Sequence, residues 1–346
     1  MRSRQRIEAI PGALRLTLEK AGQEYGSSVR EFRWGDGPIY VCPIGKCAGI
    51  GWAAGYAFEA FLGRPVVARP AEVFHNYGHS LLEAGAVLLM IASGSDAPEV
   101  TEFAQAVRRR GVKLMLLTNV PDSSLAKAAD QIVLIRAEGD GDVPAVTVCL
   151  HAALNYLALT AARILKRHDP SWESLEQEIF SLPGRIEWTL TQFPALIGSL
   201  TAELTRTSRL RIVGAGFYHY PAWQGARRFE CLTGLSVEGV EVSEFLSGQA
   251  GLTQRDDAVL YVSGSRSKLK KLVHRSASQA RVAGARVLSI TDGNDRDLAE
   301  RSDLGILLPT LMEAAGSTLS LCLMEWLAGE AARAGKPAEP TRLPSH

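Results

Sequence analysis

One stretch decides the fold: residues 91–99, Ile-Ala-Ser-Gly-Ser-Asp-Ala-Pro-Glu, where an apolar run ends in a Ser/Gly turn just before a helical pattern. A strand that stops in such a turn leaves the backbone amides at the start of the next helix pointing outward, which suits an anion such as phosphate. The chain contains this turn twice, as Ser93-Gly94-Ser95 and as Ser263-Gly264-Ser265. The second copy points to an internal repeat.

Other matching residues support the repeat, because the offset between them stays between 170 and 173 positions. The matches are Gly45 with Gly216, Phe58-Glu59 with Phe229-Glu230, Thr118-Asn119 with Thr291-Asp292, and Asp130 with Asp303. A nearly constant offset over such a length predicts two copies of one domain.

Strands and helices alternate within each copy. In the first copy we expect strands at 39–44, 66–68, 86–92, 112–117 and 132–135, and helices at 6–23, 98–110, 123–129 and 146–166, with a further helix between the Gly45 turn and Gly63. The 86–92 stretch is almost entirely apolar, as in a parallel strand buried on both faces. This order predicts an α/β fold with a doubly wound parallel sheet in each domain.

Composition narrows the class of protein. The chain has 346 residues, of which 46% are hydrophobic, and a formal net charge of +1. Length and hydrophobic content suffice for two cores of about 150 residues each. The small net charge argues against nucleic acid or an acidic membrane surface as a partner. No stretch reaches the roughly 20 apolar residues of a membrane helix, and no signal peptide is recognisable, so we expect neither membrane insertion nor export.

The cysteines and glycines exclude further classes. Five cysteines without a CxxC pair indicate neither a disulfide framework nor a zinc site, which suits a reducing, cytoplasmic compartment. Gly214-Ala215-Gly216 resembles the start of a dinucleotide fingerprint, but His219 stands at the position of the third glycine. We therefore expect no nicotinamide or other cofactor and no metal.

Several motifs carry a family resemblance. They are Ile7-Glu8-Ala9-Ile10-Pro11 with Thr17-Leu18, Leu182-Pro183-Gly184-Arg185-Ile186-Glu187, the 117–126 segment Leu-Thr-Asn-Val-Pro-Asp-Ser-Ser-Leu-Ala, and Glu244-Phe245-Leu246-Ser247-Gly248. With these motifs the chain resembles tandem sugar isomerase (SIS) domain proteins, a family that includes the isomerase half of glucosamine-phosphate synthase and related phosphosugar isomerases, deaminases and deglycases. The resemblance implies a flavodoxin-like sheet in each domain, a homodimer, and a sugar phosphate as the small-molecule partner.

The resemblance also suggests how the chain is divided. We expect an N-terminal helical arm at 1–34, a first SIS domain at 35–168, and a linker with the leading helix of the second repeat at 169–205. A second SIS domain should occupy 206–332, followed by a C-terminal tail at 333–346.

The family holds the sugar's phosphate in two turns of the first domain, after the first and third strands. The corresponding residues here are Lys46 and Cys47 in the first turn, and Ser93, Gly94, Ser95 and Asp96 in the second. Ala92 and Ala97 stand where the family has hydroxyls, and Asp96 adds a negative charge. Lys46 supplies a cation that the family lacks.

The catalytic positions that the resemblance implies are also altered. The family's catalytic Glu falls in register with Cys231, one residue from Glu230, while its His falls on Ser247 and its tail Lys on Ser345. A carboxylate base needs only suitable geometry and pKa, so Glu230, Glu238 or Glu244 could replace the family's base. The match of Glu230 with Glu59 in the other copy favours a structural role for Glu230.

Three functions follow from these residues. The first is an aldose/ketose isomerase or a deaminase-like enzyme acting on a hexose or hexosamine phosphate. The second is a sugar-phosphate-binding or regulatory protein without catalysis, on a degenerate isomerase scaffold. The third is a different reaction in which Cys231 is the nucleophile.

Overall fold

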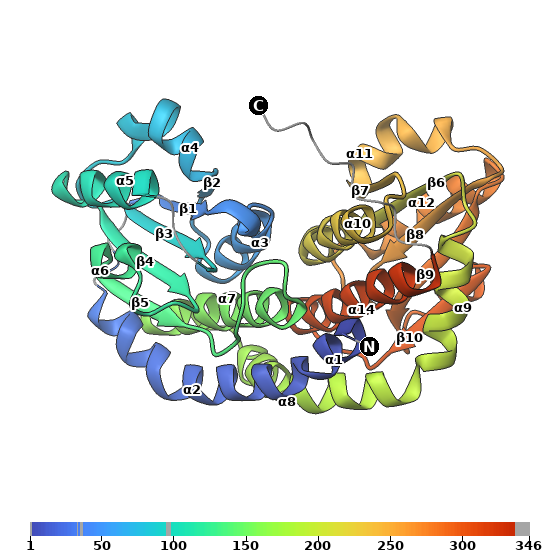
Figure 1. Cartoon of the computed structure of the whole chain (residues 1–346), viewed down its shortest axis with the longest axis horizontal. Coiled ribbons are helices and arrows are strands. Elements are labelled where there is room, and N and C mark those ends of the chain that lie inside the picture. The colour runs from blue at the N-terminus through green and yellow to red at the C-terminus, as the bar shows by residue number, and fades with distance from the viewer. Residues whose placement is uncertain (1, 33, 35–36, 95–97, 336–346) are drawn as a thin grey trace. The chain divides into compact units, whose positions relative to one another are not determined.

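The computed structural model describes residues 2–32, 34, 37–94 and 98–335. The chain divides into two compact units (Figure 1). The N-terminal unit contains residues 6–188 together with 312–319, and the C-terminal unit contains the other described residues. Each unit has one parallel five-stranded sheet flanked by helices.

The N-terminal sheet has the strand order β2-β1-β3-β4-β5. Its strands are β1 (Ile39–Pro43), β2 (Val66–Ala68), β3 (Val87–Ala92), β4 (Lys113–Thr118) and β5 (Gln131–Leu134). All pairings are parallel, and every residue of the central β3 is buried. The apolar stretch before Ser93 is therefore the middle strand of the sheet, and the predicted doubly wound fold is confirmed.

Helices cover both faces of this sheet. They are α2 (Ile10–Glu31), α3 (Ile50–Leu62), α5 (Pro98–Arg109), α6 (Ser124–Ala128) and α7 (Pro144–Ile164), with α1 (Arg2–Glu8) before them and the short α4 (Ala71–Val73) after β2. Helix α8 (Trp172–Gln192) packs on α7, where the ring of Phe180 meets that of Tyr156 edge to face. The helix expected at 6–23 is longer than predicted, because α2 continues through the Gly-Ser stretch at 26–28. Tyr25 explains the extension, since its ring is buried and its hydroxyl donates to the carbonyl of Leu134 at 2.9 Å.

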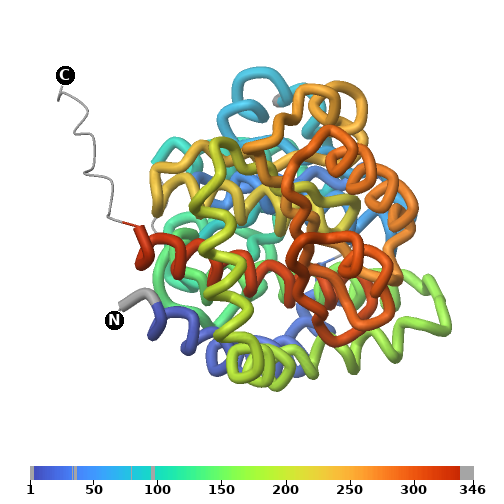
Figure 2. Tube along the Cα trace, turned by 90° about the vertical axis from the view of Figure 1, so that its right-hand side faces the viewer, coloured from blue at the N-terminus to red at the C-terminus, as the bar shows by residue number. Residues whose placement is uncertain are grey.

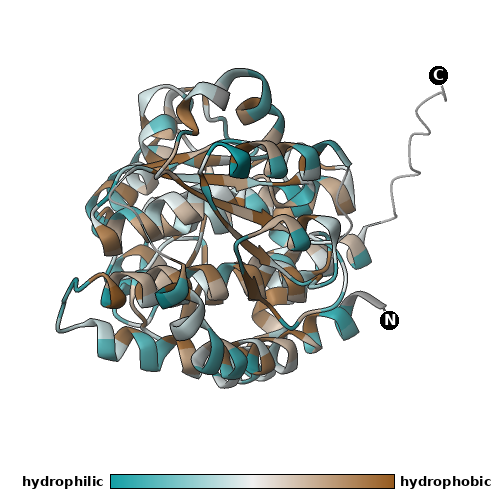
Figure 3. Ribbon diagram, turned by 90° about the vertical axis from the view of Figure 1, so that its left-hand side faces the viewer, coloured by the Kyte–Doolittle hydropathy of each residue, from teal (hydrophilic) through white to brown (hydrophobic). Residues whose placement is uncertain are grey.

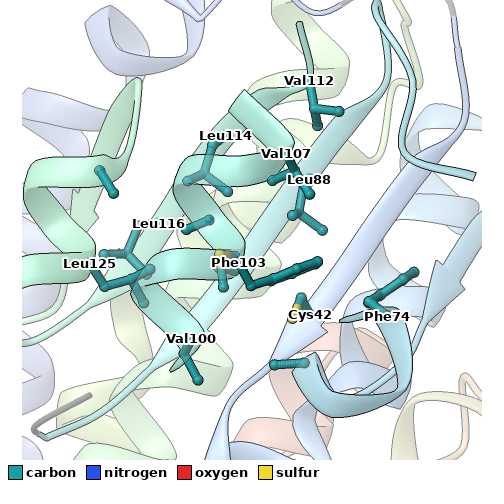
Figure 4. Packing of buried hydrophobic residues seen from close by; sticks show 14 of the residues in the cluster. Cys42, Phe74, Leu88, Val100, Phe103, Val107, Val112, Leu114, Leu116 and Leu125 are labelled. Atoms are coloured by element: carbon teal, nitrogen blue, oxygen red, sulfur yellow. The ribbon is translucent and has the colours of Figure 1, made fainter. Parts of the chain in front are cut away.

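The core between α5 and the sheet consists of interlocking aliphatic and aromatic side chains. Leu88 and Leu114 from neighbouring strands contact a cluster that includes Phe103 and Val107 of α5 (Figure 4). Hydropathy colouring shows brown strands in the interior and teal segments on the surrounding helices (Figure 3). Burial of large side chains at about 25 cal/mol per Å² holds α5 in place, and with it the turn at Gly111 that leads to β4.

Helix α7 corrects one expectation. It is long and apolar enough to span a membrane, whereas the sequence analysis expected no such stretch. Its whole apolar window is buried inside the protein, as in the central helix of a packed domain. Its apolar character is explained by packing against α2, α3 and the sheet.

The C-terminal unit repeats the same topology. Its sheet has the order β10-β9-β8-β6-β7, formed by β6 (Arg209–Gly214), β7 (Val237–Glu241), β8 (Asp257–Val262), β9 (Arg286–Asp292) and β10 (Leu304–Leu308). The trace can be followed in Figure 2 from yellow-green at α9 to red at α14. Its helices are α9 (Pro194–Leu204), α10 (His219–Thr233), α11 (Val242–Ser247), α12 (Lys270–Val282), α13 (Arg296–Glu300) and α14 (Glu313–Ala334).

Individual hydrogen bonds are repeated as well. Asp130 accepts from the N–H of Leu114 at 2.8 Å, and Asp303 accepts from the N–H of Val287 at the same distance. Both pairs are separated by the same number of residues, and both fix the start of the fourth strand of a sheet. Asp130 and Asp303, one of the pairs that suggested the repeat, therefore have the same role in the two units.

Candidate functional site

The carboxyl edge of the N-terminal sheet brings the predicted turns together. Strands β1 and β3 are neighbours, but the chain continues from them to opposite sides of the sheet, which makes their ends a topological switch point. Ligands of open α/β sheets bind in this place. The turn after β1 contains Lys46 and Cys47, and the turn after β3 contains Ser93. Sγ of Cys47 and Oγ of Ser93 are 3.2 Å apart, within hydrogen-bonding distance.

Glycines shape both turns. Gly45 has φ +54° and Gly94 has φ +87°, a left-handed region in which glycine is favoured. The N–H of Gly94 donates to Oδ1 of Asn119 at 3.3 Å. Nδ2 of Asn119 donates to the carbonyls of Ala137 at 3.0 Å and Gly139 at 2.6 Å. Asn119, which the sequence analysis used only as a marker of the repeat, thus ties the second turn to the segment after β5.

This segment, residues 139–143, packs over the two turns. A Cβ on Gly141 would lie 3.0 Å from Cβ of Lys46 and 3.2 Å from Oγ of Ser93. The carbonyl of Gly141 accepts a hydrogen bond from Oγ1 of Thr147 at 3.1 Å, which anchors the segment on α7. The close approach therefore favours glycine at position 141, because a Cβ there would push its neighbours aside by a few tenths of an ångström.

Residues 139–143 also place two carboxylates beside the ammonium group of Lys46. Nζ of Lys46 lies 2.8 Å from Oδ2 of Asp140 and also forms an ion pair with Asp142. Hydrogen bonding to Asp140 and then Asp142 raises the pKa of Lys46, and the bond from Lys46 lowers the pKa of Asp140. The three side chains are almost half exposed, so water screens the cluster and an incoming anion can compete for Lys46.

Asp140 and Asp142 were not among the residues predicted for the site. The available signal was two aspartates in a glycine-rich run directly after the last strand of the sheet. Of the six predicted phosphate-binding residues, the structure brings together Lys46, Cys47, Ser93 and Gly94. Ser95 and Asp96 lie outside the described residues.

The corresponding turns of the C-terminal unit are filled. Gly216 has φ +57°, like Gly45, but Phe217 and Tyr218 stand where the N-terminal unit has Lys46 and Cys47. A Cβ on Gly264 would lie only 2.2 Å from the Tyr218 hydroxyl oxygen. The buried tyrosine therefore occupies the space beside the Ser263-Gly264-Ser265 turn.

The carboxylate of Asp292 takes the hydrogen-bond donors of this turn. It accepts from the N–H of Ser265 at 2.7 Å and from the Ser265 hydroxyl at 3.0 Å. It also accepts from the hydroxyl of Thr310 at 3.0 Å and the N–H of Asn294 at 2.9 Å. Asp292 aligns with Asn119, so an internal anion stands in one unit where the other has a neutral amide.

The catalytic candidates lie in the C-terminal unit on two helices. Glu230 and Cys231 are exposed near the end of α10, and Glu244 is exposed in the first turn of α11. Cys231 is a free thiol, and the other four cysteines are buried. Ser247 donates from its hydroxyl to the carbonyl of Ser243 at 2.7 Å, within α11. Ser345 lies outside the described residues.

Glu230 and its counterpart Glu59 have different surroundings. Oε1 of Glu59 accepts from the N–H of Val66 at 3.1 Å, which fixes the start of β2. Within the described part of the chain, no donor contacts the carboxylate of Glu230. The structural role that the repeat favoured for Glu230 is therefore seen at Glu59 only.

The inner face of α10 is held by a buried ion pair. Nε of Arg228 donates to Oε2 of Glu325 at 2.8 Å, and Nε2 of Gln224 donates to Oε1 at 3.2 Å. All three side chains are buried. This cluster fixes the orientation of the helix that exposes Glu230 and Cys231.

Comparison with known proteins decides the family. The SIS domain family model matches residues 36–162 and 203–328, which is more than half of the chain. The chain belongs to the SIS domain family. Each matched SIS region contains one of the two sheets, so the resemblance seen in the sequence and the fold of two SIS domains are both confirmed.

The SIS chain is similar to larger enzymes. It is 22% identical over 348 residues to the glutamine–fructose-6-phosphate aminotransferase (isomerizing) of Gloeobacter violaceus, covering 97% of this chain and 56% of that enzyme. It is 24% identical over 309 residues to the enzyme of the same name from Synechocystis, covering 85% and 49%. The SIS chain thus spans about half the length of these curated relatives.

Solved structures show the same fold. The C-terminal domain of glucosamine-fructose-6-phosphate aminotransferase from Francisella tularensis aligns with a TM-score of 0.85 at 16% identity, covering 98% of both chains. The tagatose-6-phosphate ketose/aldose isomerase from Escherichia coli aligns with a TM-score of 0.75 at 15% identity, covering 99% of this chain and 97% of that one. At such identities the likeness shows the SIS fold alone.

Proposed function

We propose that this SIS protein binds a sugar phosphate at the carboxyl edge of its N-terminal sheet and interconverts the aldose and ketose forms of the sugar. The observation that supports binding most directly is the convergence of Lys46, Ser93 and Gly94 at the switch point. The relatives' names mention fructose 6-phosphate and tagatose 6-phosphate, which supports a hexose or hexosamine phosphate as substrate.

Phosphate binding in this proposal combines one charge with a few hydrogen bonds. The hydroxyl of Ser93 donates to a phosphate oxygen, and Lys46 turns from its carboxylate partners toward the phosphate. Asp140 and Asp142 repel the dianion, so part of the attraction of Lys46 is cancelled. We therefore expect weaker phosphate binding than a turn with an unpaired lysine would give.

The reaction needs a base that moves a proton between two neighbouring sugar carbons. A carboxylate does this if it reaches the carbon-bound proton and has a suitable pKa. Glu230 is exposed and has no hydrogen-bond donor on its carboxylate among the described residues. We propose Glu230 as this base, with Glu244 as the second choice.

Proton exchange with solvent tests this proposal directly. The purified protein is incubated in D2O with a panel of hexose and hexosamine 6-phosphates, and NMR follows loss of the C1 or C2 proton and formation of the other isomer. We expect conversion of at least one sugar and a loss of 100-fold or more in Glu230→Gln with unchanged binding. Glu59→Gln is the matched control and should keep full activity.

Three outcomes would each contradict one part of the proposal. Binding of a sugar phosphate without exchange or conversion of any sugar in the panel would overturn the isomerase assignment. Equal binding by wild type and Lys46→Gln would overturn the assignment of the site. Full activity of Glu230→Gln together with an inactive Glu244→Gln would move the base to α11.

A regulatory sugar-phosphate-binding protein is the second candidate. Cys231 and Ser247 stand where the resemblance implies Glu and His, and the hydroxyl of Ser247 is engaged within its own helix. A hexose phosphate that raises the Tm without being converted would support this function. Loss of activity on alkylation of the exposed Cys231, with ligand binding retained, would instead support the thiol as the nucleophile.

The homodimer, the cytoplasmic location and the absence of nucleic-acid and membrane partners remain proposals. Light scattering coupled to size-exclusion chromatography measures the mass of the particle directly. A mass of twice 37.4 kDa would support the dimer, and a mass of 37.4 kDa would contradict it.

A further inference from the structure

A second basic hollow lies at the opposite edge of the N-terminal sheet. It forms where α5 ends and β4 begins, has a volume of about 400 Å³, and is lined by Gln105, Arg108, Arg109, Gly111, Val112, Lys113 and Asp130. Three of these side chains are cations and one is an anion. The hollow is at the amino ends of the strands, whereas the proposed sugar-phosphate site is at their carboxyl ends.

One of the cations has an internal task. Nε and Nη2 of Arg108 donate to Oδ1 of Asp130 at 3.1 and 2.8 Å, and Nη1 donates to the carbonyl of Ala128 at 2.8 Å. The other oxygen of Asp130 accepts from the N–H of Leu114. Arg108 and Asp130 thus satisfy each other and the backbone.

The other two cations that line the hollow are Arg109 and Lys113. Within the described residues, neither side chain has an acidic partner, and both are exposed around the hollow. The dipole of α5 favours a cation in its last turn, which accounts for one arginine there. It does not account for Lys113, because this residue belongs to β4.

Comparison with the C-terminal unit shows that Arg108 belongs to the duplicated framework and that Arg109 does not. Arg281 aligns with Arg108 and likewise donates from Nη1 to a backbone carbonyl, that of Arg301, which aligns with Ala128. Gly284 has φ +88° and aligns with Gly111 at +85°. The position of Arg109, however, is occupied by Val282.

Arg286, the counterpart of Lys113, has an acidic partner. Arg286 forms an ion pair with Glu203 of α9, in a hollow whose lining includes Asp303, the counterpart of Asp130. The C-terminal copy therefore forms the same framework with one cation at the end of the helix, Arg281, and one ion-paired cation on the strand, Arg286. Among the residues that the structure describes, the N-terminal hollow has two cations without an ion-pair partner, Arg109 and Lys113, whereas Arg286 of the C-terminal hollow is paired with Glu203.

We propose that the hollow formed by Arg109, Lys113 and Gln105 binds a small doubly charged anion of the phosphate class, either free phosphate or the phosphate group of a metabolite. Two cations and an amide donor around a small hollow suit such an anion by charge and by hydrogen bonding. The arginine presents a planar fork and the lysine a point charge. This site is separate from the proposed sugar-phosphate site and does not depend on it.

Calorimetric titration with inorganic phosphate, in a Lys46→Gln background, tests the inference. This variant removes the cation of the carboxyl-edge site, so remaining binding reports the hollow. We expect Lys46→Gln to bind phosphate still, and the triple variant with Arg109→Gln and Lys113→Gln to bind at least 10-fold more weakly. The matched control, Arg286→Gln in the same background, should stay within 2-fold.

The outcomes are distinguishable. No phosphate binding by folded Lys46→Gln protein, or equal binding by the triple variant, would overturn the inference. An equal loss in the Arg286→Gln control would show a general effect of charge and also overturn it. If the sugar-phosphate proposal fails and this inference holds, wild type and Lys46→Gln bind phosphate equally well. Phosphate binding is then weakened only by Arg109→Gln and Lys113→Gln. A titration with glycerol phosphate then distinguishes a phosphate ester from the free ion.

Discussion

The turns that begin at Ser93 and Ser263 each follow the third strand of their sheet, but their surroundings are opposite. In the C-terminal unit the buried Tyr218 covers Gly264, and the carboxylate of Asp292 accepts the turn's hydrogen bonds. In the N-terminal unit the neutral Asn119 holds the turn, and Lys46 with Cys47 stands in place of Phe217 with Tyr218. One copy is satisfied internally, and the other has the Ser93 hydroxyl and the Lys46 ammonium at the carboxyl edge of the sheet, where we propose that a ligand binds. Under this proposal the N-terminal domain binds the ligand and the corresponding turn of the C-terminal domain is structural.

Making the open turn resemble the filled one gives the largest expected effect. Asn119→Asp puts a negative charge beside Gly94, as Asp292 does beside Ser265. Two charges about 4 Å apart near a protein surface repel by about 4 kcal/mol. We expect hexose-phosphate binding to weaken by about 100-fold or more in calorimetric titration, with Arg109→Gln and Lys113→Gln present in both proteins so that the hollow at the amino edge does not contribute. Folded protein, checked by circular dichroism, that binds as tightly as wild type would contradict the comparison.

The reverse change tests the filled turn. Asp292→Asn removes the charge that accepts from Ser265 and Thr310 at 3.0 Å or less. Hydrogen bonds to charged groups contribute about 1.5–3 kcal/mol each, and the amide oxygen retains some of them. We expect the free energy of unfolding to fall by about 2–3 kcal/mol in urea titration. A change below about 0.5 kcal/mol would show that the turn does not depend on its internal anion.

Buried histidine gives the N-terminal unit its own pH dependence. His151 of α7 is fully buried, and burial lowers its pKa to about 3, while Nδ1 lies 2.8 Å from the hydroxyl of Thr318. The unfolded chain binds a proton near pH 6.5 and the folded chain does not, so stability falls as pH drops below 6.5. We expect this group to remove about 2 kcal/mol of unfolding free energy at pH 5.

The measurement is urea unfolding at pH 7 and pH 5 in wild type and His151→Gln. Glutamine does not titrate, so the variant should lose this part of the pH dependence. His219 of the C-terminal unit also has a pKa lowered by burial, and His219→Gln serves as the comparison. An identical pH slope in wild type and His151→Gln would contradict the assignment.

The paired glutamates give the smallest effect on stability. Glu59→Gln weakens the hydrogen bond from the N–H of Val66, which should cost about 0.5–1 kcal/mol of unfolding free energy. Glu230→Gln removes an exposed carboxylate and should change stability by less than about 0.5 kcal/mol. Thermal unfolding of the two variants side by side measures the difference. The opposite order would make Glu230 the structural member of the pair.

Much of the fold could be predicted from the sequence because its signals are local. The apolar strands and the glycines at the turns depend on neighbouring residues, and the repeat is visible because each copy carries the same local signals. The strand positions agree with the structure to within about two residues. The extension of α2 could not be predicted, because Gly26 and Ser28 favour a loop locally. The buried Tyr25, which reaches Leu134 in the sheet, overrides that preference.

The site could be predicted only in part, for the same physical reason. Lys46, Cys47, Ser93 and Gly94 lie in turns that follow strands, so topology alone brings them together. The ion pairs of Lys46 with Asp140 and Asp142 depend on the path of a loop that Asn119 and Thr147 hold in place. The difference between Glu59 and Glu230 likewise depends on one hydrogen bond across space. Such contacts leave no periodic pattern in the chain.

The central claim is that the N-terminal turn binds an external anion and the C-terminal turn does not. The most direct test is an NMR titration of isotope-labelled protein with a hexose 6-phosphate, following the backbone amides of Gly94 and Ser265 in one experiment. The account predicts a saturable shift of the Gly94 amide that disappears in Lys46→Gln, and an unmoved Ser265 amide. A shift at Ser265 with none at Gly94 would contradict it.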